Sequence, residues 1–167
     1  MFVRLFLFLV VVLSGYVYSE EIYIPDIEIN DIMYADLTDI ECLSIAIYHE
    51  ARGESIQGQR YVAQTIMNRV RSKRFGADTA CEVVRQKRQF SFTHDGLTDS
   101  VSEDRTAFVL AYVIAIDFFH LDSMVNDEHA LDYLYYVNPD KLKRMPNWSS
   151  GLPAKKINNH LFMRHDS

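Results

Sequence analysis

The chain has 167 residues, of which 49% are hydrophobic, and it carries 17 Lys and Arg against 23 Asp and Glu, a formal net charge of −6. This length and composition predict one globular domain and exclude disordered, collagen-like and low-complexity chains. Two cysteines are too few for a disulfide-rich miniprotein, and an acidic chain without a basic, aromatic-rich motif does not suit nucleic acid as a partner.

The first 19 residues (1–19) have the pattern of a secretory signal peptide. Arg4 supplies a short basic region, Leu5–Leu13 is an unbroken apolar run, and Ser19 is a small residue before the expected cleavage site. The apolar stretch 5–18 is shorter than the ~20 residues that span a bilayer, so we expect export and cleavage, with no stable membrane anchor afterwards. The mature protein is then periplasmic or extracellular. A retained anchor is the alternative.

The rest of the chain is predicted to divide into an acidic leader, 20–37, and one domain, 38–167. In an exported protein Cys42 and Cys81 can form a disulfide, which would close a loop of about 40 residues. Two structural thiols are the alternative, because spacing alone does not establish a bridge.

Three helices are predicted in the first half of the domain. Thr38 and Glu41 have the spacing of a capping box ahead of an amphipathic run, which predicts a helix over 38–51. A second helix is expected over 55–72, because apolar residues recur there at every fourth position. Another capping-box pattern predicts a short third helix over 79–84.

The second half mixes one long helix with short strands. Gln89–Thr93 alternates polar and aromatic residues, which indicates a short strand or an aromatic loop. A long apolar helix from residue 100 or 102 to 118 is expected at the centre of the fold. Strands are predicted at 134–137 and 159–163, separated by an irregular segment. The predicted fold class is α+β, predominantly α, in a single domain.

A metal site is not predicted. His49 and Glu50 resemble the start of a zinc-protease motif, but Gly53 stands where the second histidine is needed. The remaining histidines show no ligand spacing, so we expect no metal and no cofactor.

Glu50 is a candidate general acid. It lies at the predicted end of the first helix, where the negative end of the helix dipole disfavours an ionised carboxylate. If aromatic residues also remove it from water, its pKa rises and it can supply the proton that glycosidic bond cleavage needs. A surface glutamate paired with Arg52 is the alternative interpretation.

A series of short motifs runs through the domain in a fixed order. They are Cys42–Glu54, which contains Glu-Ala-Arg-Gly-Glu, then Gly58-Gln59, Asn68-Arg69-Val70, Cys81–Val84, Gln89-Phe90-Ser91, Asp95-Gly96, Tyr135–Pro139, Trp148 and Ile157–Phe162. In this order and spacing the chain resembles the SleB-type cell wall hydrolases, which are related to the spore-cortex-lytic enzymes. The resemblance spans roughly residues 41 to 163.

The resemblance implies a lysozyme-like domain that acts on peptidoglycan as a lytic transglycosylase, cutting between N-acetylmuramic acid and N-acetylglucosamine. Glu50 matches the family's general acid, which protonates the glycosidic oxygen and then takes the proton of the muramic C6 hydroxyl, leaving a 1,6-anhydro ring. Peptidoglycan is the expected partner of a monomeric enzyme that uses no metal, in cell-wall remodelling or phage-type lysis.

The other candidate site residues are of types that can bind glycans, because sugars bind to flat aromatic faces and to amide groups. These substrate-binding candidates are Gln89, Phe90, Ser91, Tyr136, Asn138 and Trp148. Core packing is the alternative for Phe90 and Tyr136. Glu54 and Asp95 are possible second acids of a hydrolytic muramidase, although a structural role is preferred for Glu54. A non-catalytic peptidoglycan-binding protein is the alternative from another class.

Overall fold

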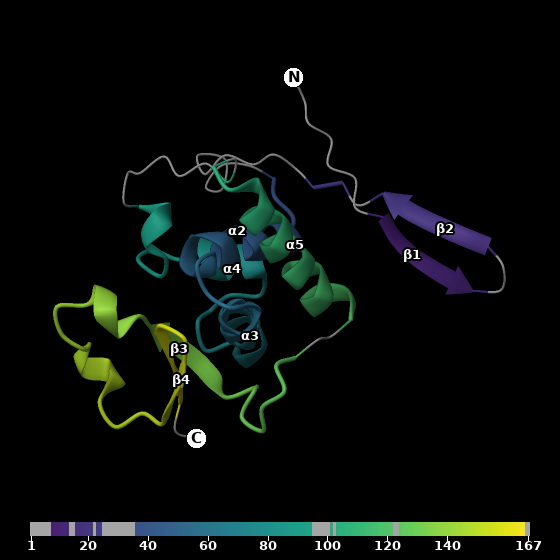
Figure 1. Ribbon diagram of the computed structural model, residues 1–167. Coiled ribbons are helices and arrows are strands. Elements are labelled where there is room, and N and C mark those ends of the chain that lie inside the picture. The colour runs from purple at the N-terminus through teal and green to yellow at the C-terminus, as the bar shows by residue number, and fades with distance from the viewer. Residues whose placement is uncertain are drawn as a thin grey trace.

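The computed structural model describes residues 8–13, 16–21, 23–24, 36–94, 101, 103–121 and 124–165. Its main body combines helices with a small antiparallel sheet, which lies at the end of the body opposite α5 (Figure 1). The helices are α2 (Asp39–Ala51), α3 (Ile56–Ser72), α4 (Ala80–Arg85) and α5 (Arg105–His120), and the strands of the sheet are β3 (Tyr133–Val137), β4 (Ala154–Ile157) and β5 (His160–Arg164). The predicted class, mostly helical with a few short strands, is confirmed.

Helix α2 lies at the centre of this body, a place that the sequence analysis gave to α5. Every residue from Cys42 to Tyr48 is buried, because α2 packs against α3, α4 and α5. Helix α5 buries a single face, which includes Phe108, Ala111 and Phe118. A helix that is covered on several sides needs apolar or small residues all round, whereas α5 uses its apolar residues to cover α2 from one side.

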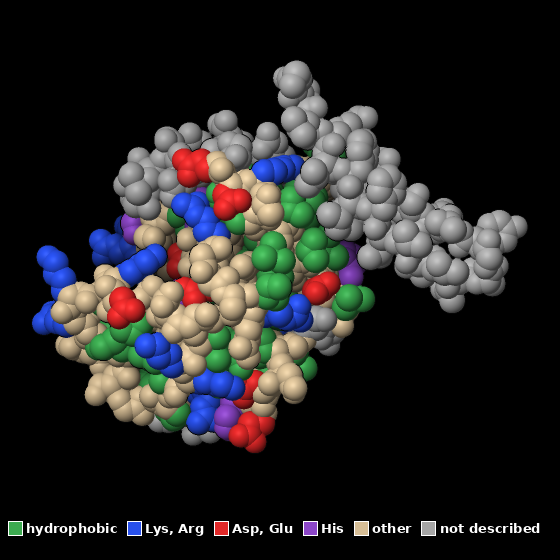
Figure 2. All heavy atoms as spheres, in the orientation of Figure 1, with side chains coloured by type: hydrophobic (Ala, Val, Ile, Leu, Met, Phe, Trp, Pro, Cys, Tyr) green, Lys and Arg blue, Asp and Glu red, His purple; other side chains and the backbone are tan. Residues whose placement is uncertain are grey.

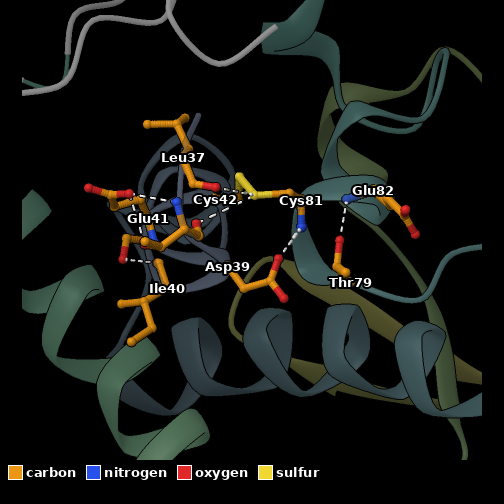
Figure 3. The surroundings of a disulfide bond; sticks show 10 residues. Leu37, Asp39, Ile40, Glu41, Cys42, Thr79, Cys81 and Glu82 are labelled. Atoms are coloured by element: carbon orange, nitrogen blue, oxygen red, sulfur yellow. Dashed lines mark hydrogen bonds between the residues drawn. A yellow bond between two sulfur atoms is a disulfide. The ribbon is translucent and has the colours of Figure 1, made fainter. Parts of the chain in front are cut away.

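Capping and a disulfide fix the start of α2. Thr38 Oγ1 accepts a hydrogen bond from the Glu41 N–H at 3.3 Å, and the Glu41 carboxylate accepts one from the Thr38 N–H at 2.7 Å, so the predicted capping box is complete. A disulfide joins Cys42 in α2 to Cys81 in α4, and the Cys81 N–H donates to the Asp39 carboxylate at 3.0 Å (Figure 3). These contacts hold α4 against the N-terminal end of α2.

Helix α4 has only half of the capping box that its sequence predicted. Thr79 Oγ1 accepts from the Glu82 N–H at 3.1 Å. The Glu82 carboxylate, however, accepts from the N–H of Asp78, one residue before the cap, at 2.6 Å. The helix therefore begins where it was expected, with a different partner for the acidic side chain.

One other expectation about local structure is wrong, and one that had two alternatives is decided. The long helix begins after Asp104, whose carboxylate accepts from the Ala107 N–H at 3.0 Å, and not at Ser100 or Ser102. The Gln89–Thr93 segment forms no strand, and its last part is the short 3-10 helix η1 (Ser91–Thr93). Of the two alternatives for that segment, the aromatic loop is the one observed.

Buried polar side chains of α3 hold the segment that leads into β3. The Asn68 side-chain amide donates to the carbonyl oxygens of Ala130 at 2.8 Å and Tyr133 at 2.9 Å. The Gln64 side-chain oxygen accepts from the Val125 N–H at 3.2 Å. Because these groups are buried, each bond satisfies a polar atom that water cannot reach.

The sheet has the strand order β3-β5-β4, with both pairs antiparallel. Strands β4 and β5 form a hairpin whose connection includes Asn158, at φ 51°, a left-handed conformation that asparagine tolerates better than most residues. Strand β4 was not predicted, because its first three residues are exposed and show no apolar alternation. The strands β3 and β5 were predicted within one residue of their observed starts.

The N-terminal region contains a separate hairpin, in which β1 (Phe8–Leu13) pairs antiparallel with β2 (Tyr16–Glu21). The predicted signal peptide covers most of this hairpin, and its cleavage stays a prediction. In the part of the chain that the structure describes, no helix is both long and apolar enough to cross a membrane.

Candidate active site

Glu50 lies in the last turn of α2, where this helix meets β3. The Tyr136 hydroxyl donates a hydrogen bond to the Glu50 carboxylate. Burial raises the pKa of Glu50 above its ordinary value, while the Tyr136 hydrogen bond and the positive charges of Lys141 and Arg69 oppose the rise. Burial is the largest of these effects, so Glu50 keeps its proton to a higher pH than a surface glutamate does.

Tyr136 serves as a neutral donor in this pair. Its pKa lies well above the ordinary value, because it is removed from water and because the Glu50 carboxylate disfavours a second negative charge nearby. The phenol therefore stays protonated and can donate to Glu50 whenever the carboxylate is ionised. Tyr136 also packs beside His160 of β5, with ring centroids 5.5 Å apart.

Arg69 is a member of this site that the sequence analysis did not single out. Its Nε donates to the Leu134 carbonyl at 2.9 Å, and its Nη1 donates to the Gln89 side-chain oxygen at 3.2 Å. Only 6% of the residue is exposed, and burial lowers its pKa while the charge of Glu50 opposes that change. Arg69 thus ties α3 to β3 and to the Gln89 segment, and its positive charge acts on the candidate acid.

The predicted cleft residues around Gln89 divide between the surface and the core. Gln89 and Ser91 are exposed, whereas Phe90 is 1% exposed and packs against Phe92. A ring that is covered on both faces cannot stack on a sugar, so the core interpretation holds for Phe90. Phe92 stacks on His49 with ring centroids 4.7 Å apart, which places the loop beside the end of α2.

Trp148 is the most exposed of the aromatic candidates, at 51%. It lies in the short helix η3 (Asn147–Ser149), and its ring centroid is 5.2 Å from that of Tyr135 in β3. Asn138 directly follows β3 and caps the short helix η2 (Pro139–Lys141), where its side-chain oxygen accepts from the Asp140 N–H at 3.1 Å. Both candidates therefore lie on the segment that follows β3, which begins two residues after Tyr136.

Glu54 is held by the β4–β5 hairpin. Its carboxylate accepts from the Asn159 N–H at 3.3 Å and from the Asn159 side-chain amide at 3.0 Å, and it lies 3.5 Å from Nδ1 of His160. The structural role preferred for Glu54 is consistent with these contacts, which tie the turn after α2 to the backbone and side chain of Asn159 in the hairpin. Asp95 lies outside the described residues.

Asp127 is a second carboxylate with a displaced pKa, in the direction opposite to that of Glu50, and its contacts are those of a structural anion. Its Oδ2 accepts from Lys155 Nζ at 2.7 Å and from the hydroxyls of Tyr61 at 2.6 Å and Tyr133 at 3.1 Å. These donors hold its pKa far below the ordinary value. Within the described ranges, no group of three or more His, Cys, Asp and Glu side chains is placed to hold a metal ion.

Comparisons with known proteins agree on one family. The family model described as Cell Wall Hydrolase matches residues 53–163, so its match begins three residues after Glu50. The spore cortex-lytic enzyme of Oceanobacillus iheyensis is 31% identical over 126 residues, which cover 75% of this chain and 41% of that protein. The spore cortex-lytic enzyme of Bacillus subtilis is 31% identical over 125 residues, which cover 74% of this chain and 37% of that protein. The match therefore spans less than half the length of these relatives.

Two solved structures are similar to this chain. The catalytic domain of the germination-specific lytic transglycosylase SleB from Bacillus anthracis is 30% identical, with a TM-score of 0.55, and the alignment covers 78% of this chain and 98% of that one. The catalytic domain of the Bacillus cereus SleB protein is 29% identical, also with a TM-score of 0.55, over 80% of this chain and 96% of that one. The resemblance to SleB-type hydrolases that the sequence motifs indicated is confirmed.

Proposed function

Because the chain belongs to the cell wall hydrolase family, we propose that it is a lytic transglycosylase that cleaves peptidoglycan between N-acetylmuramic acid and N-acetylglucosamine. The observation that carries the proposal is the state of Glu50, a carboxyl whose pKa is raised by burial and which has a tyrosine hydroxyl as its partner. A carboxyl group whose pKa is raised keeps its proton to higher pH, and it is then better able to donate that proton to a glycosidic oxygen.

In the first step, the Glu50 carboxyl gives its proton to the oxygen that leaves with N-acetylglucosamine, and the bond from muramic C1 to that oxygen breaks. Positive charge develops on the muramic ring, and Glu50 becomes a carboxylate. The Tyr136 hydroxyl and the positive charge of Arg69 both favour this ionised form, as their lowering effect on the Glu50 pKa indicates.

In the second step, the carboxylate takes the proton of the muramic C6 hydroxyl, and the C6 oxygen bonds to C1. The product carries a 1,6-anhydro ring, no water is consumed, and Glu50 is protonated again. One carboxyl therefore serves as acid and then as base. This scheme needs no second carboxylate, which agrees with the engagement of Glu54 by Asn159.

The remaining candidates have different roles in binding the glycan. We propose that Gln89, Ser91 and Asn138 provide hydrogen bonds, and that the exposed ring of Trp148, supported by Tyr135, provides a flat face for a sugar. Phe90 is not proposed again as a cleft residue, because it is buried.

The enzyme is proposed to act outside the cytoplasm, at the cell wall, in remodelling or in phage-type lysis. The disulfide between Cys42 and Cys81 supports an extracytoplasmic location, because disulfides persist in oxidising compartments. The signal peptide at residues 1–19 is the proposed route of export, after which the mature protein acts as a monomer without a stable anchor.

The test compares the wild-type protein with the Glu50→Gln variant on purified sacculi. Release of soluble fragments measures cleavage, and co-sedimentation with the sacculi measures binding. We expect Glu50→Gln to bind as wild type does and to release no fragments above background. If the variant clears sacculi at the wild-type rate, Glu50 is not the acid, and if neither protein releases fragments while both bind, the chain is a binding protein.

A further inference from the structure

The segment 138–153, which connects β3 to β4 and is here named the basic loop, has a charge opposite to that of the chain as a whole. Lys141, Lys143 and Arg144 are all exposed in it, and Asp140 is its single acidic residue. Lys and Arg side chains gather at the edge of the molecule where this segment lies (Figure 2). In a chain with a net charge of −6, such a local excess of positive charge requires an explanation.

The basic loop begins next to the candidate acid. It leaves β3 two residues after Tyr136, which hydrogen-bonds to Glu50. The ring contact between Trp148 and Tyr135 holds its second half on the same strand. The charge of Lys141 reaches the Glu50 carboxyl. A ligand in contact with Glu50 therefore lies within reach of at least one loop cation.

The positive side chains of the basic loop alternate with exposed apolar ones. Leu142 is 39% exposed and Met145 is 41% exposed, and they flank Lys143 and Arg144. A surface of this kind suits a ligand with several carboxylates and aliphatic side chains more than it suits a stripped glycan strand, whose charge comes only from the lactyl carboxylate of each muramic acid.

We propose that the basic loop binds the acidic peptide stem of the muramic acid residue, and that the enzyme therefore prefers glycan strands that carry stems over strands from which the stems have been removed. This inference rests on the proposed function, because it needs muramic acid beside Glu50. The stem is attached to muramic acid itself, so it begins on the same sugar ring as the C1 bond that is cut. Stem peptides carry free carboxylates and alanine methyl groups, which complement the loop.

The test measures kcat/KM on two soluble substrates, the same glycan strands with stems intact and after amidase removal of the stems. We expect wild type to prefer stem-bearing strands by about tenfold, the effect of two or three exposed charge contacts of ordinary strength. This preference should shrink as NaCl is raised, because the contacts are exposed. The double variant Lys143→Gln/Arg144→Gln should bring the ratio of the two kcat/KM values close to one. Lys141 is left in place, because its charge acts on Glu50 itself.

Lys156→Gln is the matched control, since Lys156 is an exposed cation of β4 outside the basic loop. It should leave the preference at the wild-type value. Equal kcat/KM values on the two substrates for wild type would overturn the inference. So would a double loop variant whose kcat/KM falls by the same factor on both substrates.

Binding separates this inference from the proposed function. The Glu50→Gln variant, with and without the two loop substitutions, is titrated with stem-bearing and stripped strands, so a preference is measured whether or not wild type cleaves. A stem preference that depends on Lys143 and Arg144 supports the inference even if cleavage is absent. If the loop substitutions instead abolish binding to vesicles of anionic phospholipid and leave stem preference unchanged, the loop binds membranes and the inference is wrong.

Discussion

Asn68 should be one of the residues on which the stability of the fold depends most, although no part in the proposed reaction is assigned to it. The residue is 2% exposed, its amide donates to the carbonyls of Ala130 and Tyr133, and its side-chain oxygen accepts from the Gln64 side-chain amide at 2.9 Å. Asn68→Ala removes all three bonds and leaves their partners buried without replacements. At about 1 kcal/mol for each bond, the expected loss of unfolding free energy is about 3 kcal/mol.

The assay is thermal or urea unfolding with the disulfide intact, followed by circular dichroism. For a body of this size, a loss of about 3 kcal/mol lowers Tm by about 10 °C. Gln57→Ala is the matched control, because Gln57 is an exposed amide on the first turn of the same helix, and its substitution should change stability by less than about 0.5 kcal/mol. If Asn68→Ala costs no more than Gln57→Ala, the buried amide does not hold the segment before β3, and our explanation of how β3 is positioned fails.

Three further predictions concern the disulfide and the candidate acid. Replacing Cys42 and Cys81 by alanine should lower the free energy of unfolding by about 4 kcal/mol, the loop-closure estimate for a separation of 39 residues, and an unchanged urea midpoint would contradict it. Activity should fall as pH rises through the raised pKa of Glu50, and Glu50→Gln should be more stable than wild type at pH values above that pKa. The sign follows because the folded state binds the Glu50 proton more tightly than the unfolded state, so wild type loses stability as pH rises. If the difference in unfolding free energy between wild type and Glu50→Gln is the same at pH 4 and pH 8, this prediction is wrong. Tyr136→Phe removes a hydrogen bond that favours the carboxylate, so the alkaline limb of the pH–activity profile should move to higher pH, whereas an unmoved limb would mean that this bond does not act on Glu50.

Local signals in the sequence predicted most of the helical body. Helix α3 was expected over 55–72 and is observed over Ile56–Ser72, because its cap and its apolar period agree. The position of Glu50 at the end of α2 followed in the same way from the capping box and the amphipathic run after it. The start of α5 was misplaced, since Ser100, Ser102 and Asp104 are all suitable caps and sequence alone does not rank them.

What the sequence could not predict depends on contacts between distant residues. Arg69 falls seven residues after Val62 and three after Ile66, on the apolar face of α3, and that position was the available signal that it is buried. Its partners Leu134 and Gln89 lie 65 and 20 residues away, so its role became visible only in the structure. Phe90 shows the same limit, because the alternation of Gln89–Thr93 is compatible with either a cleft or a core position.

The most direct test of the account is the chemical form of the new glycan ends. Mass spectrometry of fragments released from purified peptidoglycan distinguishes an end in 1,6-anhydro-N-acetylmuramic acid from a reducing end, which is heavier by one water. We predict anhydro ends with wild type and no fragments with Glu50→Gln. Reducing muramic acid ends from the wild-type protein would contradict the single-carboxyl scheme and would require a water-activating group such as Glu54 or Asp95.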